Sequence, residues 1–209
     1  MPSKAKIIAV ALAHLANIAS ARHVRRDADE GSGGSDGGGG IDKTTAHGVI
    51  ACIAWLIFLI GAVLMRALKG PKTWLVHACT QSIALVLVVA SVALGIQLAQ
   101  SGHQLDEAHV VIGLLLFAAL WVLAIGGLLQ HLYFRKHHQR SFIGVAHAWS
   151  ARGMITLAIV NGGLGLALAG GHEAGTYAAY GVVTAVIWIC WVGFTAISMR
   201  RESRNTKGQ

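Results

Sequence analysis

The sequence is poor in charged residues. Only 12% of its 209 residues are charged, and nine acidic residues stand against 17 lysines and arginines. A soluble domain carries roughly 25% charged residues, while 55% of this chain is hydrophobic. The shortage therefore indicates long uncharged segments and argues against a soluble globular protein.

Cysteine and proline are also scarce. The three cysteines, Cys52, Cys79 and Cys190, all fall inside apolar segments. None forms the close pair of a zinc motif, and none lies where an extracellular disulfide would be useful. We expect them to be small apolar core residues. Of the two prolines, Pro71 follows Gly70 and marks a turn between two apolar segments.

Two nucleotide-related functions are excluded by the sequence. The net charge of +8 comes from basic residues in short segments between or after apolar runs, and no basic stripe with interleaved aromatic residues is present, so we expect no nucleic-acid binding. The glycine-rich run 31–40 lacks the Gly-Lys-Ser/Thr ending and the preceding strand of a phosphate-binding loop.

Five apolar runs are each long enough to cross a bilayer, which needs about 20 residues. In lipid every backbone amide must be bonded internally, so each run is expected to be a helix. The sequence predicts an all-α, multi-pass transmembrane bundle of five helices in contact with membrane lipid. The predicted spans are 46–68, 74–99, 109–130, 142–169 and 178–199.

The segments around the spans differ in composition. Residues 1–21 have a basic start, an apolar stretch and the small residues Ala19-Ser20-Ala21, which is typical of a signal peptide, although a short uncleaved helix is the alternative. The glycine-rich residues that follow suit a flexible tether. The predicted organisation is a signal peptide at 1–21, a tether at 22–45, a transmembrane domain at 46–199 and a basic tail at 200–209.

The distribution of lysine and arginine predicts the orientation. Segments 66–72 and 131–141 each contain three such residues and segment 200–209 contains four, whereas loops 100–108 and 170–177 contain none. Basic connectors stay on the cytoplasmic side. We therefore predict a cytoplasmic C-terminus and a non-cytoplasmic tether, in the plasma membrane or an endomembrane.

Each of the first four spans carries a histidine near its start. Histidine is rare in lipid because its polar ring needs a partner there. Spans that start on the same side place His47 level with His109, and His77 level with His147. Histidine on both sides of a haem gives six-coordinate iron suited to electron transfer. We predict two b-type haems, with iron ligated by the pairs 47/109 and 77/147.

The residue four positions after each histidine lies on the same helix face. Ala51, Gly113 and Ala151 are small enough there for a flat macrocycle to approach, whereas Gln81 is larger and could form a hydrogen bond. A glycine-rich stretch in the fourth span, 161–165, is expected to allow close helix packing, with its asparagine bonding to a neighbouring helix.

Basic residues near the predicted cytoplasmic face are candidates for a further role. Arg66, Lys72 and Arg152, together with Lys69, could neutralise haem propionates or an anionic donor. We expect His131, His137 and His138, in or beside the basic turn, to be solvated.

At these residues the chain resembles the cytochrome b561 family, especially the core of fungal proteins in which it is fused to a haem-binding DOMON domain. The resemblance covers about 46–199, and no DOMON domain is recognised in this chain. Ala151 stands where the family often has glycine. The matching motifs are AHGVI, VHACTQ, HVVIGLLLF and HAWSARG around the four histidines, HLYFRK at the basic turn and VNGGLGL in the fourth span.

The resemblance implies transmembrane electron transfer from cytoplasmic ascorbate to ferric iron or a monodehydroascorbate radical on the other side. The resemblance thus implies an oxidoreductase of the ferric reductase type, in which the cofactor would carry the chemistry and no catalytic acid or base would be needed. Two alternatives are an electron-relay subunit of another oxidoreductase and a haem-free channel or proton-coupled transporter. A homodimer is compatible with each of these functions.

Overall fold

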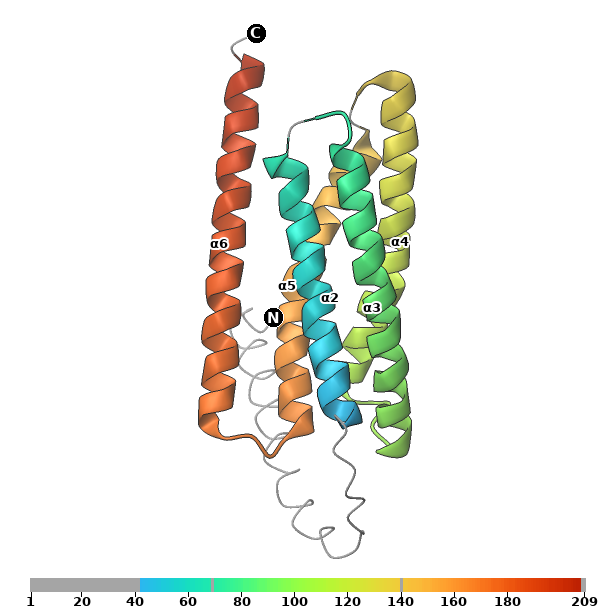
Figure 1. The fold of residues 1–209 in the computed structure, drawn as a ribbon, viewed down its shortest axis with the longest axis vertical. Helices are drawn as coiled ribbons and strands as arrows, with labels where there is room; N and C mark the ends of the chain where they lie inside the picture. Colours follow the sequence, from blue (N-terminus) through green and yellow to red (C-terminus); the bar gives the residue numbers. More distant parts are fainter. Residues whose placement is uncertain (1–41, 69, 140, 208–209) are drawn as a thin grey trace, which may run out of the picture. The chain divides into compact units, whose positions relative to one another are not determined.

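The computed structural model describes residues 42–68, 70–139 and 141–207. The predicted signal peptide and nearly all of the predicted tether lie outside this part. The elements of this part are α-helices without strands (Figure 1). All five are long and apolar enough to cross a membrane. This confirms the predicted all-α membrane bundle. The helices are α2 (Lys43–Ala67), α3 (Thr73–Ser101), α4 (Ala108–His137), α5 (Phe142–Ala169) and α6 (Ala174–Lys207).

Asp42 determines where α2 begins. Its carboxylate accepts hydrogen bonds from the backbone N–H groups of Thr44 (2.8 Å) and Thr45 (3.0 Å) and from the Thr45 hydroxyl. These bonds, that of the Thr45 side chain most of all, hold the pKa of Asp42 below its ordinary value. A side chain that satisfies free N–H groups favours a helix start, so α2 begins at Lys43, before the first apolar run at residue 46.

Two helices extend beyond their apolar runs. α4 continues to His137, through much of the predicted basic turn, and ends where His138 takes a left-handed conformation (φ 52°). α6 begins at Ala174 instead of 178 and continues to Lys207, through most of the predicted tail. Lysine, arginine and glutamate favour helices, so the helix persists after the hydrophobic residues end. The predicted span 142–169 coincides with α5.

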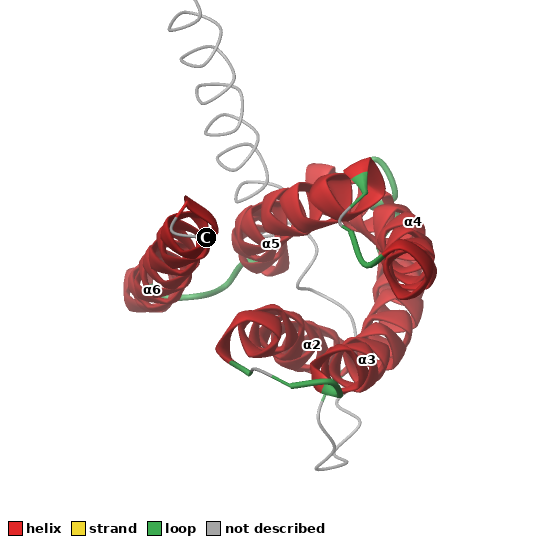
Figure 2. Ribbon diagram, turned by 90° about the horizontal axis from the view of Figure 1, so that it is seen from above, coloured by secondary structure: helices red, strands yellow, loops and turns green. Residues whose placement is uncertain are grey.

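The first four helices form a ring, and α6 stands beside it (Figure 2). α2 packs most extensively on α3, and α4 on α5, while α3–α4 and α2–α5 contacts close the ring. α6 contacts α5 and α2. Two helix pairs therefore face each other diagonally across the ring, α2 with α4 and α3 with α5.

The buried core of the described bundle is narrow. Ala54, Val88 and Leu120 form its central cluster, while many large apolar side chains such as Val122 (71% exposed) face outward. An apolar exterior suits helices surrounded by lipid. All three cysteines are free and exposed, so the prediction that they belong to the core was wrong. Cys52 is exposed to a cavity inside the bundle that it helps to line. Cysteine is hydrophobic enough for Cys79 and Cys190 to occupy an apolar surface.

Candidate functional site

The four histidine rings are each fixed by a backbone carbonyl on an adjacent helix. A carbonyl only accepts hydrogen bonds, so Nδ1 must carry the ring proton and Nε2 keeps its lone pair. Neutral imidazole with a free Nε2 is the form that ligates metals, and a carbonyl partner for the other nitrogen is typical of such ligands. The bonds run from His47 to Ser91 (2.8 Å), His77 to Gly61 (2.9 Å), His109 to Asn161 (2.9 Å) and His147 to Leu123 (3.0 Å).

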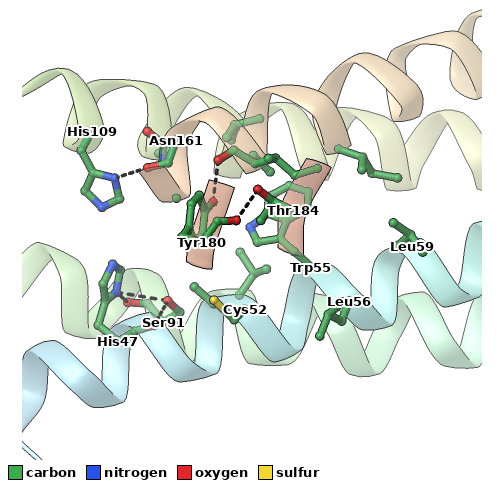
Figure 3. Close-up of a pocket in the computed structure, with 18 of the residues that line it drawn as sticks. His47, Cys52, Trp55, Leu56, Leu59, Ser91, His109, Asn161, Tyr180 and Thr184 are labelled. Atoms are coloured by element: carbon green, nitrogen blue, oxygen red, sulfur yellow. Dashed lines mark hydrogen bonds between the residues drawn. The ribbon is translucent and has the colours of Figure 1, made fainter. Parts of the chain in front are cut away.

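His47 on α2 and His109 on α4 face each other across the ring. Their ring centres lie 5.9 Å apart and their planes are nearly perpendicular, at 84°. Figure 3 shows the two rings pointing toward one another over a pocket. Two imidazoles that ligate one metal ion from opposite sides, with each nitrogen about 2 Å from the metal, have ring centres roughly 6 Å apart. The geometry therefore fits a single metal ion between these rings.

His77 on α3 and His147 on α5 belong to the other diagonal. Each lies near the start of its helix. Because α3 and α5 run antiparallel to α2 and α4, this pair lies toward the opposite end of the ring from His47 and His109. The fold thus places the two sequence-predicted pairs at two levels of one four-helix ring.

Glycines make room for three of the four rings. Each follows the carbonyl acceptor by four residues, and so lies one turn further along the same helix face. A Cβ atom at these positions would lie much closer to the ring than real Cβ atoms come to other heavy atoms. The distances from such a Cβ to the ring atom Cε1 are 2.8 Å from Gly95 to His47, 2.9 Å from Gly127 to His147 and 2.6 Å from Gly165 to His109.

His77 is held differently from the other three. Its acceptor, Gly61, is itself the close-contact glycine, and a Cβ there would lie 2.8 Å from Nε2 of Gln81. Gln81 donates a hydrogen bond to the carbonyl of Phe58 (3.2 Å), while its amide oxygen is buried without a hydrogen-bond partner. The hydrogen bond predicted for Gln81 is therefore made to α2.

A cavity of about 310 Å³ adjoins the His47–His109 pair. Ala51 and Gly113, the small residues predicted beside these histidines, both line it, and its wall is otherwise mostly aliphatic and aromatic. The amide oxygen of Asn161 is buried at this wall without a hydrogen-bond partner. A buried oxygen without a partner calls for an explanation. A largely apolar group suits this space.

Helix α6 also contributes to this cavity. The hydroxyl of Tyr180 donates to the carbonyl of Ile159 on α5 (2.6 Å), and its ring occupies the space left by Gly162 and Gly163. Further along, the indole N–H of Trp188 donates to the Thr156 hydroxyl (3.0 Å). Sequence reasoning missed Tyr180, because an apolar run does not show which of its residues faces the ring.

The glycine-rich stretch 161–165 thus has a specific purpose at each glycine. Gly162 and Gly163 receive Tyr180 from α6, and Gly165 receives His109 from α4. Close packing was predicted, and the structure shows it. Asn161 was predicted to bond to a neighbouring helix, and its backbone carbonyl does so by accepting from His109 on α4.

The candidate cations have other contacts. Arg66 forms an ion pair with Glu202 near the end of α6 (3.4 Å), and the Arg152 guanidinium lies 4.6 Å from the centre of the Trp149 ring. Lys72 is exposed at the start of α3, and Lys69 lies outside the described residues. Their role toward propionates or an anionic donor stays a prediction.

His131 was expected to be solvated, but it stacks on Trp74. The ring centres are 4.1 Å apart and the planes 24° from parallel, and His131 is half-buried. Trp74 precedes His77 by one turn on α3, and His131 follows Gly127 by one turn on α4, so the stack lies close to the second histidine pair. His137 and His138 are exposed, as predicted.

Fold and site together define a class: a multi-pass helical membrane protein whose central helices carry two diagonal pairs of metal-competent histidines. Comparison with curated proteins agrees. The chain is 32% identical over 155 residues to a cytochrome b561 and DOMON domain-containing protein of Arabidopsis thaliana, and 26% identical over 173 residues to a second such protein from that plant. These similarities support a relationship to the cytochrome b561 family.

The matched regions cover most of this chain and a minor part of each relative. They include 72% and 78% of the chain, but only 38% and 42% of the two relatives. The chain therefore spans about two fifths of the length of the curated relatives it matches. No family model matches the sequence, and no solved structure gives a significant match.

Proposed function

We propose that this protein carries electrons across a membrane as a cytochrome b561, with one b-type haem between His47 and His109 and another between His77 and His147. The observation that carries the proposal is shared by all four histidines. In each, a carbonyl on a neighbouring helix holds the Nδ1 proton and leaves Nε2 available. The 5.9 Å separation of the first two rings and the relationship to the family support the same conclusion.

A haem held by two of these histidines would supply one-electron chemistry. The chain's own residues would orient, shape and insulate that group. The four carbonyls fix the ring orientation and raise the basicity of the ligand nitrogens. Ala51 and Gly113 leave space beside the first pair, and the apolar cavity wall excludes water. Exclusion of water and hydrogen bonding to the ligands both tune a haem potential.

The two histidine pairs suit an electron path that crosses the bundle. They lie toward opposite ends of helices long enough to span a membrane. We propose ascorbate as the cytoplasmic donor and ferric iron as the acceptor on the other side, which makes the protein a ferric reductase. Arg66, Lys72 and Arg152 belong to the end of the bundle where His77 and His147 lie, and positive charge there suits an anionic donor.

Vesicles that contain the purified chain test this function. With ascorbate inside and a ferric chelate outside, we expect the chelate to be reduced, and we expect His47→Ala and His147→Ala each to abolish the reduction. His138→Ala, at an exposed histidine, is the matched control and should keep the activity. A haem-loaded chain that ascorbate reduces but that passes no electrons to the external chelate would contradict ferric reductase activity and indicate a relay subunit.

A further inference from the structure

One buried hydroxyl distinguishes His47 from the other three histidines. Ser91 on α3 is only 3% exposed. Its carbonyl accepts the Nδ1–H of His47 at 2.8 Å, while its Oγ lies 3.1 Å from the same Nδ1 and donates to the backbone carbonyl of His47 at 3.1 Å. A single serine therefore contacts both the ring and the backbone of this histidine (Figure 3).

These three contacts are compatible with one arrangement of protons. Nδ1 must carry a proton, because the Ser91 carbonyl beside it can only accept. The hydroxyl proton points to the His47 carbonyl, so a lone pair of Oγ faces the Nδ1–H. The ring proton is thus shared between two acceptors, and the hydroxyl closes a loop between α2 and α3 that fixes the tautomer and the ring orientation.

The other acceptor residues of the described bundle offer no hydroxyl. Gly61 has no side chain, and that of Leu123 is apolar. The polar side chain of Asn161 also acts on His109, but it is an amide whose oxygen has no hydrogen-bond partner. Among the described residues, the Ser91 hydroxyl is consequently a feature of the His47–His109 pair only.

We propose that Ser91 is a positioning residue for His47, and that it lowers the reduction potential of the haem at the His47–His109 pair. This inference rests on the proposed haem ligation. A second acceptor for the Nδ1–H raises the basicity of Nε2, and a more basic axial ligand stabilises ferric over ferrous iron. The two haems would therefore differ in potential partly because only one of them has this serine behind its ligand.

A spectroscopic redox titration of the purified, haem-loaded chain tests the proposal. With Ser91→Ala, one of the two midpoint potentials should rise while the other stays within experimental error. The potential that rises should belong to the haem that is lost in His109→Ala and retained in His147→Ala. Ser91→Thr keeps the hydroxyl and should restore the original potential. Ser198→Ala, which removes a hydroxyl bonded within α6 to the Phe194 carbonyl, is the control and should move neither.

Other results of the Ser91→Ala experiment also test the proposal. Loss of only the His47–His109 haem in Ser91→Ala would support a positioning role, because the second haem reports an intact fold. Unchanged potentials, an equal shift of both or loss of both haems would overturn the proposal. A native chain that binds no haem would instead overturn the proposed function itself, so the two failures are distinguishable.

Discussion

At the scale of single residues, the groups that orient the four histidines come from neighbouring helices. Ser91 and Leu123, for example, hold His47 and His147 through their carbonyls. The histidines themselves stand out in the sequence because ionisable side chains are rare in apolar runs. Their acceptors do not, since every residue has a carbonyl and only the packing of helices selects one. The second, third and fourth spans do show a trace of the pattern, in glycines four residues after the acceptors.

Adjacent glycines in α4 provide a matched test of ring placement. A Cβ at Gly127 would lie 2.9 Å from Cε1 of His147, whereas nothing lies within 4 Å of a Cβ at Gly126. We expect Gly127→Ala to displace the ring and reduce the haem content from two per chain toward one. Gly126→Ala should retain both. Haem and protein assays on the two variants make this comparison, and equal haem contents would contradict the assigned contact.

Asp42 should make the start of α2 sensitive to acid. Its pKa is lowered in the folded chain from an ordinary value of 3.8, chiefly by its hydrogen bond with the Thr45 side chain. A lowered carboxyl pKa contributes stability above the unfolded value, and this contribution is lost as the pH falls through the folded value. The protection of the Thr44 and Thr45 amides, measured as their exchange rate relative to the intrinsic rate at the same pH, should therefore fall below about pH 4.

Two substitutions of Asp42 separate its role as the N-cap of α2 from the effect of its negative charge. Asp42→Asn keeps a good N-cap and should remove most of the acid dependence of this protection at the helix start. Asp42→Ala should lower the protection at neutral pH as well. If protection in the native chain is the same at pH 6 and pH 3, the carboxylate does not hold the helix end.

At the scale of helices, α6 is attached to the ring by a few specific contacts. Tyr180 bonds to the Ile159 carbonyl at 2.6 Å, and Trp188 bonds to Thr156. The apolar runs predicted all five helices because twenty uncharged residues have few other structures available in lipid. The apolar runs did not predict where α4 and α6 end, because charged residues such as Arg135 and Glu202 continue a helix without being hydrophobic.

Removal of the Tyr180 hydroxyl should weaken the attachment of α6. A buried hydrogen bond contributes about 1 kcal/mol, so we expect Tyr180→Phe to lower the free energy of unfolding in detergent by roughly that amount. Tyr177→Phe, on the same helix at a more exposed position, should change it little. Equal effects of the two substitutions would show that the bond to Ile159 is not what holds α6.

At the scale of the whole molecule, the ring of four helices brings together histidines separated by 62 and 70 positions in the chain, His47 with His109 and His77 with His147. Alternating spans made this pairing predictable, because helices that start on one side place their first turns at one level. The rotation of each helix about its axis was not predictable. The cavity, the role of Tyr180 and the stack of Trp74 on His131 all depend on that rotation.

The charge distribution leads to a prediction for the orientation of the whole chain. Basic connectors at 66–72 and 131–141 and the basic end of α6 share one face of the bundle, and such segments stay cytoplasmic. A C-terminal epitope tag should therefore be reached by antibody in cells only after the membrane is permeabilised. Labelling of intact cells that display the protein at their surface would reverse the assignment.

The pairing of the histidines across the ring is the central claim, and haem quantitation with reduced-minus-oxidised spectra on alanine variants tests it most directly. The native chain should bind two b-type haems. The double variant His47→Ala/His109→Ala should lose one haem, as each single variant does, and so should His77→Ala/His147→Ala, whereas His47→Ala/His77→Ala should lose both. A native chain without b-type bands, or a His47→Ala/His77→Ala chain that keeps one haem, would contradict the account.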